Sequence, residues 1–228
     1  MDSSSRPHYI LAIDGVSGSG KSSTAKRVAR ELGILHLDTG AMYRAVTLLA
    51  LEQGLRPDQT PEIEALVNGL HWDADADGKL TVDGRDLSGE IRTDKVAAAV
   101  SDYARLPEVR QALVPVQRAI GMRQSAVVEG RDMATVVFPD ARFKFFMSAS
   151  PEVRARRRVM ELQSMGLPAD YAQVLANLSE RDSKDSGREH SPLTMAADAT
   201  EIDTSGLTFD GQVAIIVSHV LKNLAKSI

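Results

Sequence analysis

One eight-residue stretch constrains this chain more than any other feature: residues 15–22 read Gly-Val-Ser-Gly-Ser-Gly-Lys-Ser. The stretch fits the pattern G-x-x-x-x-G-K-[ST] at every fixed position. Residues 9–14 before it form a short apolar run typical of a buried strand, and residues 21–33 after it have the apolar spacing of a helix. A strand, a glycine-rich turn and a helix in this order predict an α/β fold whose turn binds phosphate groups.

We expect the backbone N–H groups of this turn to hold the phosphates of a nucleotide, because its glycines let successive N–H groups point inward. Lys21 would reach the β and γ phosphates, and the Ser22 hydroxyl would hold Mg²⁺, the one expected cofactor ion. The predicted nucleotide-binding residues are Gly15, Val16, Ser17, Gly18, Ser19, Gly20, Lys21, Ser22 and Ser23.

The rest of the chain alternates between strand and helix patterns, which predicts a parallel five-stranded sheet covered by helices on both faces. Residues 70–87 differ, because two β-like segments flank Asp77-Gly78, a hairpin signal. Pro115 should disturb the helix that contains it. The other predicted strands are 34–37, 126–132, 142–149 and 199–205, and the other predicted helices are 41–53, one from Thr60, 91–106, 107–122, 151–166, 171–185 and 211–227.

The length of 228 residues suits one ordinary domain that carries an insertion. The alternation of strand and helix patterns is interrupted around the hairpin, so we place the insertion at 63–103. The core then consists of two parts, 1–62 and 104–228, and the second part includes a basic flap at about 154–190.

The overall charge argues against nucleic acid and membrane partners. The net charge is −4 and aromatic residues make up 4% of the chain, whereas nucleic-acid binding would need a wide basic surface with aromatics. The absence of cysteine excludes disulfides and thiolate metal sites. Residues 1–8 are polar, without a secretory signal, and no apolar run approaches the roughly 20 residues of a membrane span. We expect a cytoplasmic monomer.

A second group of polar residues follows the predicted strands at their carboxyl ends, where ligands bind in open parallel sheets. Thr39 and Arg44 follow the strand 34–37, and Arg131 and Asp132 end the strand 126–132. A hydroxyl group, free helix N–H groups and guanidinium groups suit a second phosphate. The alternative for Thr39 and Arg44 is a plain helix cap with a surface arginine.

Two arginine-rich segments form the flap. Arg181, Asp185 and Arg188 recur at spacings of four and three, so they share a helical face if the helix persists. Residues 154–158, Arg-Ala-Arg-Arg-Arg, add four arginines on another helix. We interpret these segments as a mobile basic flap over phosphates, and the alternative is a solvated face of salt bridges.

These features favour a small-molecule kinase, because switches need effector loops and motors need further domains. Two alternatives stay open at this point. One is a kinase for another monophosphate or a small metabolite, and the other is a nucleotide-dependent switch or binding module without turnover.

Seven motifs resemble those of bacterial cytidylate kinases, a family of P-loop nucleoside monophosphate kinases. The likeness runs from Ile10 to about the C-terminus. It implies a P-loop kinase fold with a core, a lid and a small monophosphate-binding insertion, and a transfer of phosphate from ATP to CMP or dCMP. The motifs are GVSGSGKSS, LDTGAMYR, SGEIRT, PEVRQAL, GRDMATVVFPDA, ERDSKDSGR and SPL.

The resemblance also implies roles for single residues. Those implied for the acceptor phosphate are Thr39, Arg44, Arg131 and Arg188; for the ribose, Arg181 and Asp185; for the cytosine, Ser101, Arg110 and Asp132; and for the lid, Arg157 and Arg158. The implied catalytic residues are Lys21, Arg131, Arg158 and Arg188.

The chain departs from the family pattern at three positions. Thr39 stands where serine is frequent, and the hydroxyl group is kept. Glu129 stands where aspartate is common, which changes the reach of the carboxylate toward the water ligands of Mg²⁺. Ala134 replaces a frequent glycine and is expected to stiffen its turn.

Overall fold

The computed structural model describes residues 8–75 and 79–226. Its main sheet has five strands in the order β2-β5-β1-β6-β7, and every neighbouring pair is parallel. This architecture confirms the predicted parallel sheet. The strands are β1 (Ile10–Gly15), β2 (Leu35–Asp38), β5 (Ala126–Gly130), β6 (Phe143–Ser148) and β7 (Thr200–Asp203).

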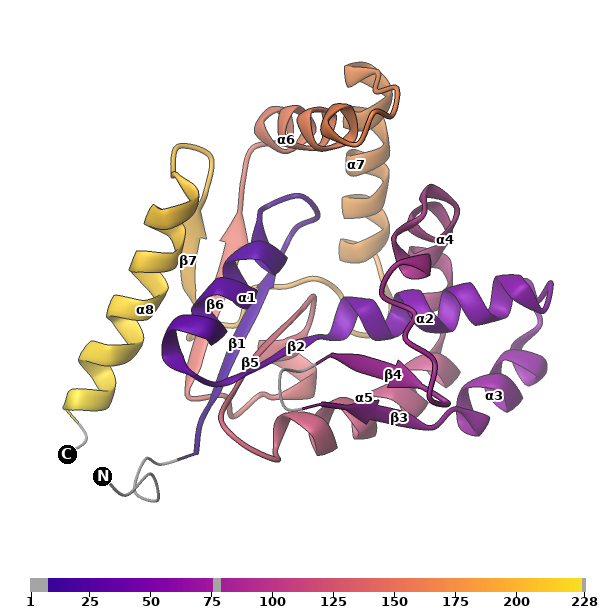
Figure 1. The fold of residues 1–228 in the computed structure, drawn as a ribbon, viewed down its shortest axis with the longest axis horizontal. Coiled ribbons are helices and arrows are strands. Elements are labelled where there is room, and N and C mark those ends of the chain that lie inside the picture. The colour runs from indigo at the N-terminus through magenta and orange to yellow at the C-terminus, as the bar shows by residue number, and fades with distance from the viewer. Residues whose placement is uncertain (1–7, 76–78, 227–228) are drawn as a thin grey trace.

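Helices cover both faces of this sheet (Figure 1), and the central strands β1 and β5 are buried on both faces. Along β1, Leu11 and Ile13 face a core formed with helices α1 (Lys21–Leu32) and α8 (Phe209–Ala225). Ile10 and Ala12 alternate to the other face. There they pack with helices α2 (Thr39–Glu52), α3 (Thr60–Gly69) and α5 (Pro107–Gly121).

A second, two-stranded sheet lies in the segment expected to be an insertion. Strand β3 (Trp72–Ala74) pairs antiparallel with β4 (Leu80–Val82), and Trp72 lies opposite Val82. This pairing agrees with the predicted hairpin, but the predicted turn at Asp77-Gly78 lies outside the described residues. The 3₁₀ turn η2 (Glu90–Arg92) and helix α4 (Asp94–Ala104) follow.

Helices α6 (Pro151–Ser164) and α7 (Tyr171–Ser186) project beyond the carboxyl ends of the strands, at the top of Figure 1. They pack on each other through a small cluster of Ala155, Leu162, Val174 and Leu178. Because this cluster is separate from the two cores on the sheet, the pair of helices forms a lobe of its own.

Three local features differ from the sequence-based expectation. Helix α5 runs unbroken through Pro115. A proline removes one backbone donor, but the buried side chains of Val109, Leu113 and Ile120 still hold the helix in the core. The expected helix 91–106 instead begins at Asp94, after the side chain of Thr93 caps it. A π-helical turn, η3 (Met133–Val137), follows β5 where no helix was predicted. No helix among the described residues is long and apolar enough to cross a membrane.

Candidate active site

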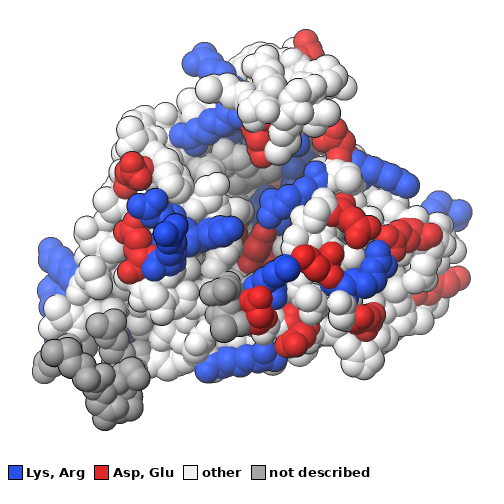
Figure 2. Space-filling model, viewed as in Figure 1, with Lys and Arg blue, Asp and Glu red and all other residues white. Residues whose placement is uncertain are grey.

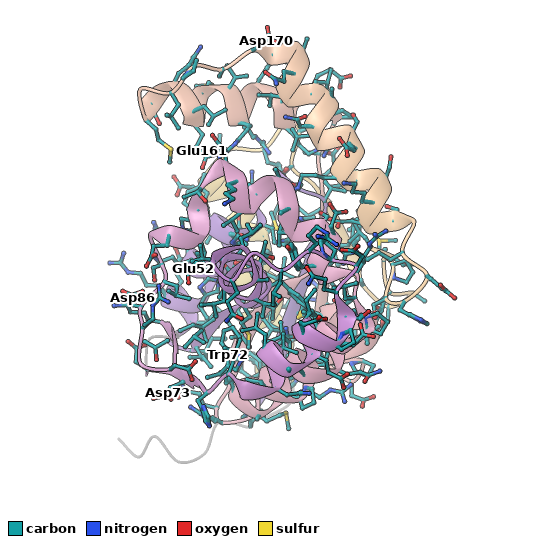
Figure 3. All side chains as sticks on the ribbon, turned by 90° about the vertical axis from the view of Figure 1, so that its right-hand side faces the viewer. Glu52, Trp72, Asp73, Asp86, Glu161 and Asp170 are labelled. Atoms are coloured by element: carbon teal, nitrogen blue, oxygen red, sulfur yellow. The ribbon has the colours of Figure 1, made fainter. Side chains whose placement is uncertain are left out.

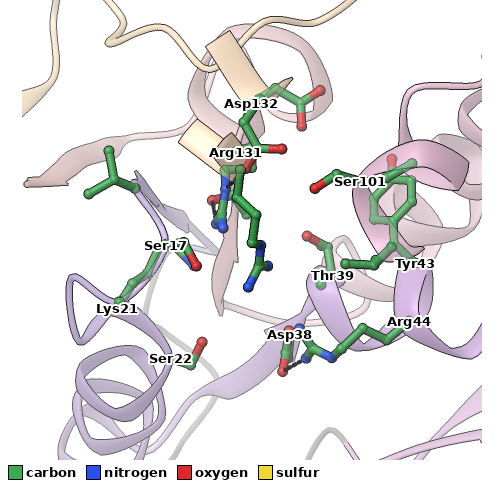
Figure 4. Close-up of a pocket in the computed structure, with 18 of the residues that line it drawn as sticks. Ser17, Lys21, Ser22, Asp38, Thr39, Tyr43, Arg44, Ser101, Arg131 and Asp132 are labelled. Atoms are coloured by element: carbon green, nitrogen blue, oxygen red, sulfur yellow. Dashed lines mark hydrogen bonds and ion pairs between the residues drawn. The ribbon is translucent and has the colours of Figure 1, made fainter. Parts of the chain in front are cut away.

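A cavity of about 360 Å³ lies at the carboxyl ends of the strands, between the phosphate-binding turn, α2, α4 and the α6–α7 lobe (Figure 4). Charged side chains gather around the hollow beneath this lobe (Figure 2). Residues predicted from separate motifs therefore meet at one place. The predicted site residues that line the cavity are Val16, Ser17, Gly18, Gly20, Lys21, Ser22, Ser23, Thr39, Arg44, Ser101, Arg110, Arg131, Asp132, Arg181, Asp185 and Arg188.

The glycine-rich turn has the backbone geometry of an anion site. Gly18 and Gly20 have φ of 76° and 86°, which other residues rarely adopt. Gly20 precedes α1, and no side chain of residues 8–75 or 79–226 caps the start of that helix. These donors are free for an anionic ligand, and the helix dipole favours negative charge there. Gly15 and Ser19 do not line the cavity and support the turn from behind: a Cβ on Gly15 would collide with the carbonyl oxygen of Met147.

Behind the turn, the carboxylate of Glu129 binds three side chains. Its Oε2 accepts from Lys21 Nζ at 3.0 Å and from Ser22 Oγ at 2.6 Å, and its Oε1 lies 3.0 Å from Nε2 of His36. The carboxylate is 1% exposed. Burial alone would raise the pKa of Glu129, but the charge of Lys21 and the bonds from His36 and Ser22 outweigh burial and hold it well below its usual range. Glu129 is therefore ionised.

The oxygens of Ser22 and Glu129 fit a magnesium ion. Mg²⁺ prefers oxygen ligands, and proteins bind it through one or two carboxylates together with substrate phosphates. A hydroxyl group and a buried ionised carboxylate stand side by side at the start of α1, next to the anion site. Among the described residues no three acidic or histidine side chains form a cage, so a metal here would depend on phosphate oxygens as well.

Across the cavity, four guanidinium groups lie around the carboxylates of Asp38 and Asp185. Arg44 pairs with Asp38 at 2.9 Å, and both Arg131 and Arg188 pair with Asp185. Arg181 is the fourth. The Nε atoms of Arg44, Arg181 and Arg188 have no hydrogen-bond partner within the described ranges. An excess of positive charge with free donors is suited to a phosphate group.

Burial and neighbouring charges shift the pKa values of Arg181 and Asp185 in the directions that such an excess produces. Burial lowers the pKa of Arg181, and the positive charge of Arg131 lowers it further. Burial acts in the opposite direction on Asp185, but the charges of Arg131 and Arg188 outweigh it and lower the pKa of that carboxyl. The cluster thus holds its cations at an electrostatic cost that an anionic ligand would relieve.

Thr39 lines the cavity and is bonded to strand β5. Its side chain is 1% exposed, and its hydroxyl group donates to the backbone carbonyl of Glu129 at 2.6 Å. Asp38, just before it, caps α2 by accepting from the N–H of Ala41 at 2.9 Å. The cap directs the start of α2 at the cavity, so the sequence expectation of a cap here and the expectation of a phosphate site are compatible.

A third region of the cavity holds Ser101, Arg110 and Asp132. Arg110 forms an ion pair with Asp132, and both are almost fully buried. The guanidinium of Arg110 also lies over the ring of Tyr43, 5.7 Å from its centre. Burial raises the pKa of Asp132, although Arg110 and Arg188 oppose the rise. A buried carboxylate beside a buried guanidinium can accept and donate hydrogen bonds to a flat polar ligand.

Arg157 and Arg158, expected in the lid, do not line the cavity. Arg157 donates to the backbone carbonyl of Thr204 at 2.6 Å and so ties α6 to the loop after β7. Arg158 pairs with Glu161 at 2.8 Å and lies 3.6 Å from Asp94 of α4. Glu161 does line the cavity, and in the side view it lies between α6 and α4 (Figure 3).

Sequence reasoning missed His36, Tyr43 and Asp14. His36 precedes Asp38 by two residues on the same strand, so the strand period places both on one face. Tyr43 follows Thr39 by four residues and shares its helical face. Asp14 is 1% exposed and accepts from the N–H groups of Met133 and Ala134, at 2.8 and 2.7 Å. No sequence pattern indicates that pairing.

Comparison with known proteins shows similarity along nearly the whole chain. Residues 11–223 match the family model described as cytidylate kinase. A cytidylate kinase from Citrifermentans bemidjiense is 43% identical over 220 residues, which cover 95% of this chain and 94% of that protein. One from Pelotomaculum thermopropionicum is 46% identical, covering 92% and 95%. Among solved structures, a shikimate kinase from Bacteroides thetaiotaomicron is 12% identical with a TM-score of 0.47, covering 96% of this chain and 99% of that one.

Proposed function

The chain belongs to the cytidylate kinase family, and we propose that it transfers the γ-phosphoryl group of ATP to CMP and dCMP, giving ADP and CDP or dCDP. The observation that carries the proposal is the single cavity that joins the glycine-rich turn to the four-arginine cluster. Phosphoryl transfer needs two polyanions close together and in line, and little covalent chemistry from the protein.

At the donor end, residues 15–23 would hold the phosphates of ATP. Lys21 would leave Glu129 for the β and γ phosphates, where its charge stabilises the transferring group. Ser22 and Glu129 would hold Mg²⁺, which when bound neutralises charge on the phosphate oxygens. The two side chains are close enough to serve one ion, since their oxygens are 2.6 Å apart.

At the acceptor end, we propose that the phosphate of CMP is held by Thr39, Arg44, Arg131 and Arg188. Asp185 and Arg181 would contact the ribose. A phosphate acceptor is already an anion, so no strong general base is required. The catalytic residues in this proposal are Lys21, Arg131, Arg158 and Arg188, of which Arg158 must leave its partners Glu161 and Asp94 to reach the phosphates.

The base would be recognised by Ser101, Arg110 and Asp132. Cytosine presents an amino donor at N4 beside acceptors at N3 and O2. A carboxylate accepts from N4, and a guanidinium donates to N3 or O2. The existing pair of Arg110 and Asp132 would open so that each partner contacts the base, which exchanges one set of buried polar contacts for another.

The domain division is part of the proposal. Residues 1–62 and 104–228 would form the core, 63–103 the monophosphate-binding insertion and about 154–190 a lid that carries Arg157 and Arg158. The separate apolar cluster between α6 and α7 supports a lid that moves as a unit. Closure over both nucleotides would exclude water and suppress hydrolysis of ATP.

The test is ADP release from the purified protein in a coupled assay with CMP, dCMP, UMP or AMP at saturating ATP and Mg²⁺. CMP and dCMP should accelerate ADP release far above the rate with ATP alone. Acceleration by AMP or UMP in preference to CMP would assign a different acceptor. Slow hydrolysis that no monophosphate accelerates would instead indicate a switch.

We also propose that the protein acts in the cytoplasm, in pyrimidine nucleotide metabolism, as a monomer without nucleic acid or membrane partners. The net charge of −4 supports the lack of diffuse attraction to anionic polymers. Light scattering at several protein concentrations tests the monomer: a mass that stays near 24.7 kDa supports it, and a doubled mass contradicts it.

A further inference from the structure

The side chain of His36 does not line the cavity, and the proposed reaction gives it no role of its own, but it contacts the active-site residue Glu129. It lies on β2 beside Val127 of β5, in the parallel register that places Asp38 beside Glu129. His36 is therefore offset by one strand period from Glu129. Its ring reaches across this diagonal and brings Nε2 to 3.0 Å from Oε1 of Glu129.

The bond has a defined direction. Glu129 forms an ion pair with Lys21, and an ionised carboxylate only accepts hydrogen bonds, so Nε2 of His36 carries the proton and donates it. The two side chains are 17% and 1% exposed, so water competes little for the carboxylate oxygen. The two oxygens of Glu129 are thus divided between partners: Oε1 is held by His36, while Oε2 contacts Lys21 and Ser22.

This division matters when ATP binds, and here the reasoning rests on the proposed function. Lys21 and Ser22 would then turn toward phosphate and Mg²⁺. Of the three side chains now bonded to Glu129, only His36 would keep its bond. A glutamate has three rotatable side-chain bonds, so without that bond its carboxylate would be free to swing away from the site.

We propose that His36 is a positioning residue, which holds Oε1 of Glu129 so that Oε2 stays directed at the place where Mg²⁺ and the ATP phosphates bind. Outer partners of metal-binding side chains commonly act in this way, and their loss typically weakens metal binding 10- to 100-fold. The pair is also matched in length. An aspartate at position 129 would withdraw the carboxylate by roughly one carbon–carbon bond, about 1.5 Å, and put it beyond the reach of His36.

The test measures equilibrium binding of ATP to the full chain, with and without Mg²⁺ and in the absence of CMP. The quantity of interest is the factor by which Mg²⁺ tightens ATP binding. His36→Phe removes the donor and should reduce that factor about 10-fold. Affinity for ATP without Mg²⁺ should change less than twofold. His36→Gln keeps an N–H donor and should recover part of the factor. The matched control is His71→Gln, whose side chain is 91% exposed on the hairpin segment.

A double-mutant cycle with Glu129→Asp isolates the contact. If His36 acts through Glu129, His36→Phe should have no further effect on the magnesium factor once residue 129 is aspartate. An equal effect in both backgrounds, or a loss of affinity for magnesium-free ATP as large as that for Mg-ATP, overturns the proposal. An unchanged factor in His36→Phe also overturns it. Because these readouts need no acceptor, they are independent of whether CMP is the substrate.

Discussion

Replacing Asp132 by asparagine should narrow the preference for CMP over UMP, because this carboxylate is proposed to accept from N4 of cytosine. Uracil carries an acceptor at O4 and a donor at N3, so it would face Asp132 and Arg110 with the wrong group at both contacts. Each buried unpaired group costs roughly 1–3 kcal/mol. Two mismatches cost roughly 2–6 kcal/mol, or from about 30-fold to more than 10⁴-fold in kcat/KM.

Asparagine removes one of the two mismatches. Its amide oxygen still accepts from N4 of cytosine, and its NH₂ group can donate to O4 of uracil. The ratio of kcat/KM for CMP to that for UMP should therefore fall by roughly 5- to 150-fold, the equivalent of 1–3 kcal/mol. The substitution also leaves Arg110 buried without its ionic partner, which weakens the fold. That loss affects both substrates alike and cancels in the ratio.

The assay is kcat/KM for CMP and for UMP at saturating ATP and Mg²⁺, in the wild type and in Asp132→Asn. Asp102→Asn is the matched control, since Asp102 lies on the neighbouring helix α4 and pairs with Lys184 outside the cavity. The control should keep the wild-type ratio. If the ratio in Asp132→Asn also stays within twofold of wild type, Asp132 does not contact the base and the acceptor is recognised elsewhere.

Three other perturbations test separate parts of the site. Lys21→Ala should lower kcat by about 10² or more with the fold intact by circular dichroism, and near-normal turnover would remove Lys21 from the proposed mechanism. Amide hydrogen exchange across 154–190 should slow when a bisubstrate analogue binds, because its phosphates would neutralise the arginines; unchanged exchange would indicate a static charged face. Burial raises the pKa of Asp14 from 3.8 to about 6, although the hydrogen bonds from the N–H groups of Ala134 and Met133 oppose the rise. Ionisation of Asp14 should therefore lower the free energy of unfolding by roughly 3 kcal/mol. That stability is fully present below about pH 4 and is lost as the pH rises through 6. The measurement is the free energy of unfolding in urea between pH 4 and 7.5, in which Asp14→Asn should not show the loss. If the free energies of the wild type and Asp14→Asn change in parallel with pH, the raised pKa of Asp14 is contradicted.

Local sequence signals predicted much of the fold. Apolar runs marked four of the five strands of the main sheet, since strands buried in a sheet need apolar sequence, and the edge strand β7 was a candidate without such a run. The hairpin was visible as two β-like segments. The π-helical turn η3 was not, because the N–H groups of Met133 and Ala134 donate to Asp14, which lies 119 residues earlier than Met133. Local preference carries no information about a partner so far away.

The chemistry of the site divides in the same way. The sequence by itself determined the phosphate-binding turn, because glycines, a lysine and a serine at fixed spacing suffice to form it. It also indicated that arginines would gather at the carboxyl ends of parallel strands. Only the tertiary structure decided which polar side chains pair: Arg131 with Asp185, Arg110 with Asp132, and His36 with Glu129. The physical reason is that an ion pair or hydrogen bond depends on distances of about 3 Å, which are set by the packing of elements far apart in the chain.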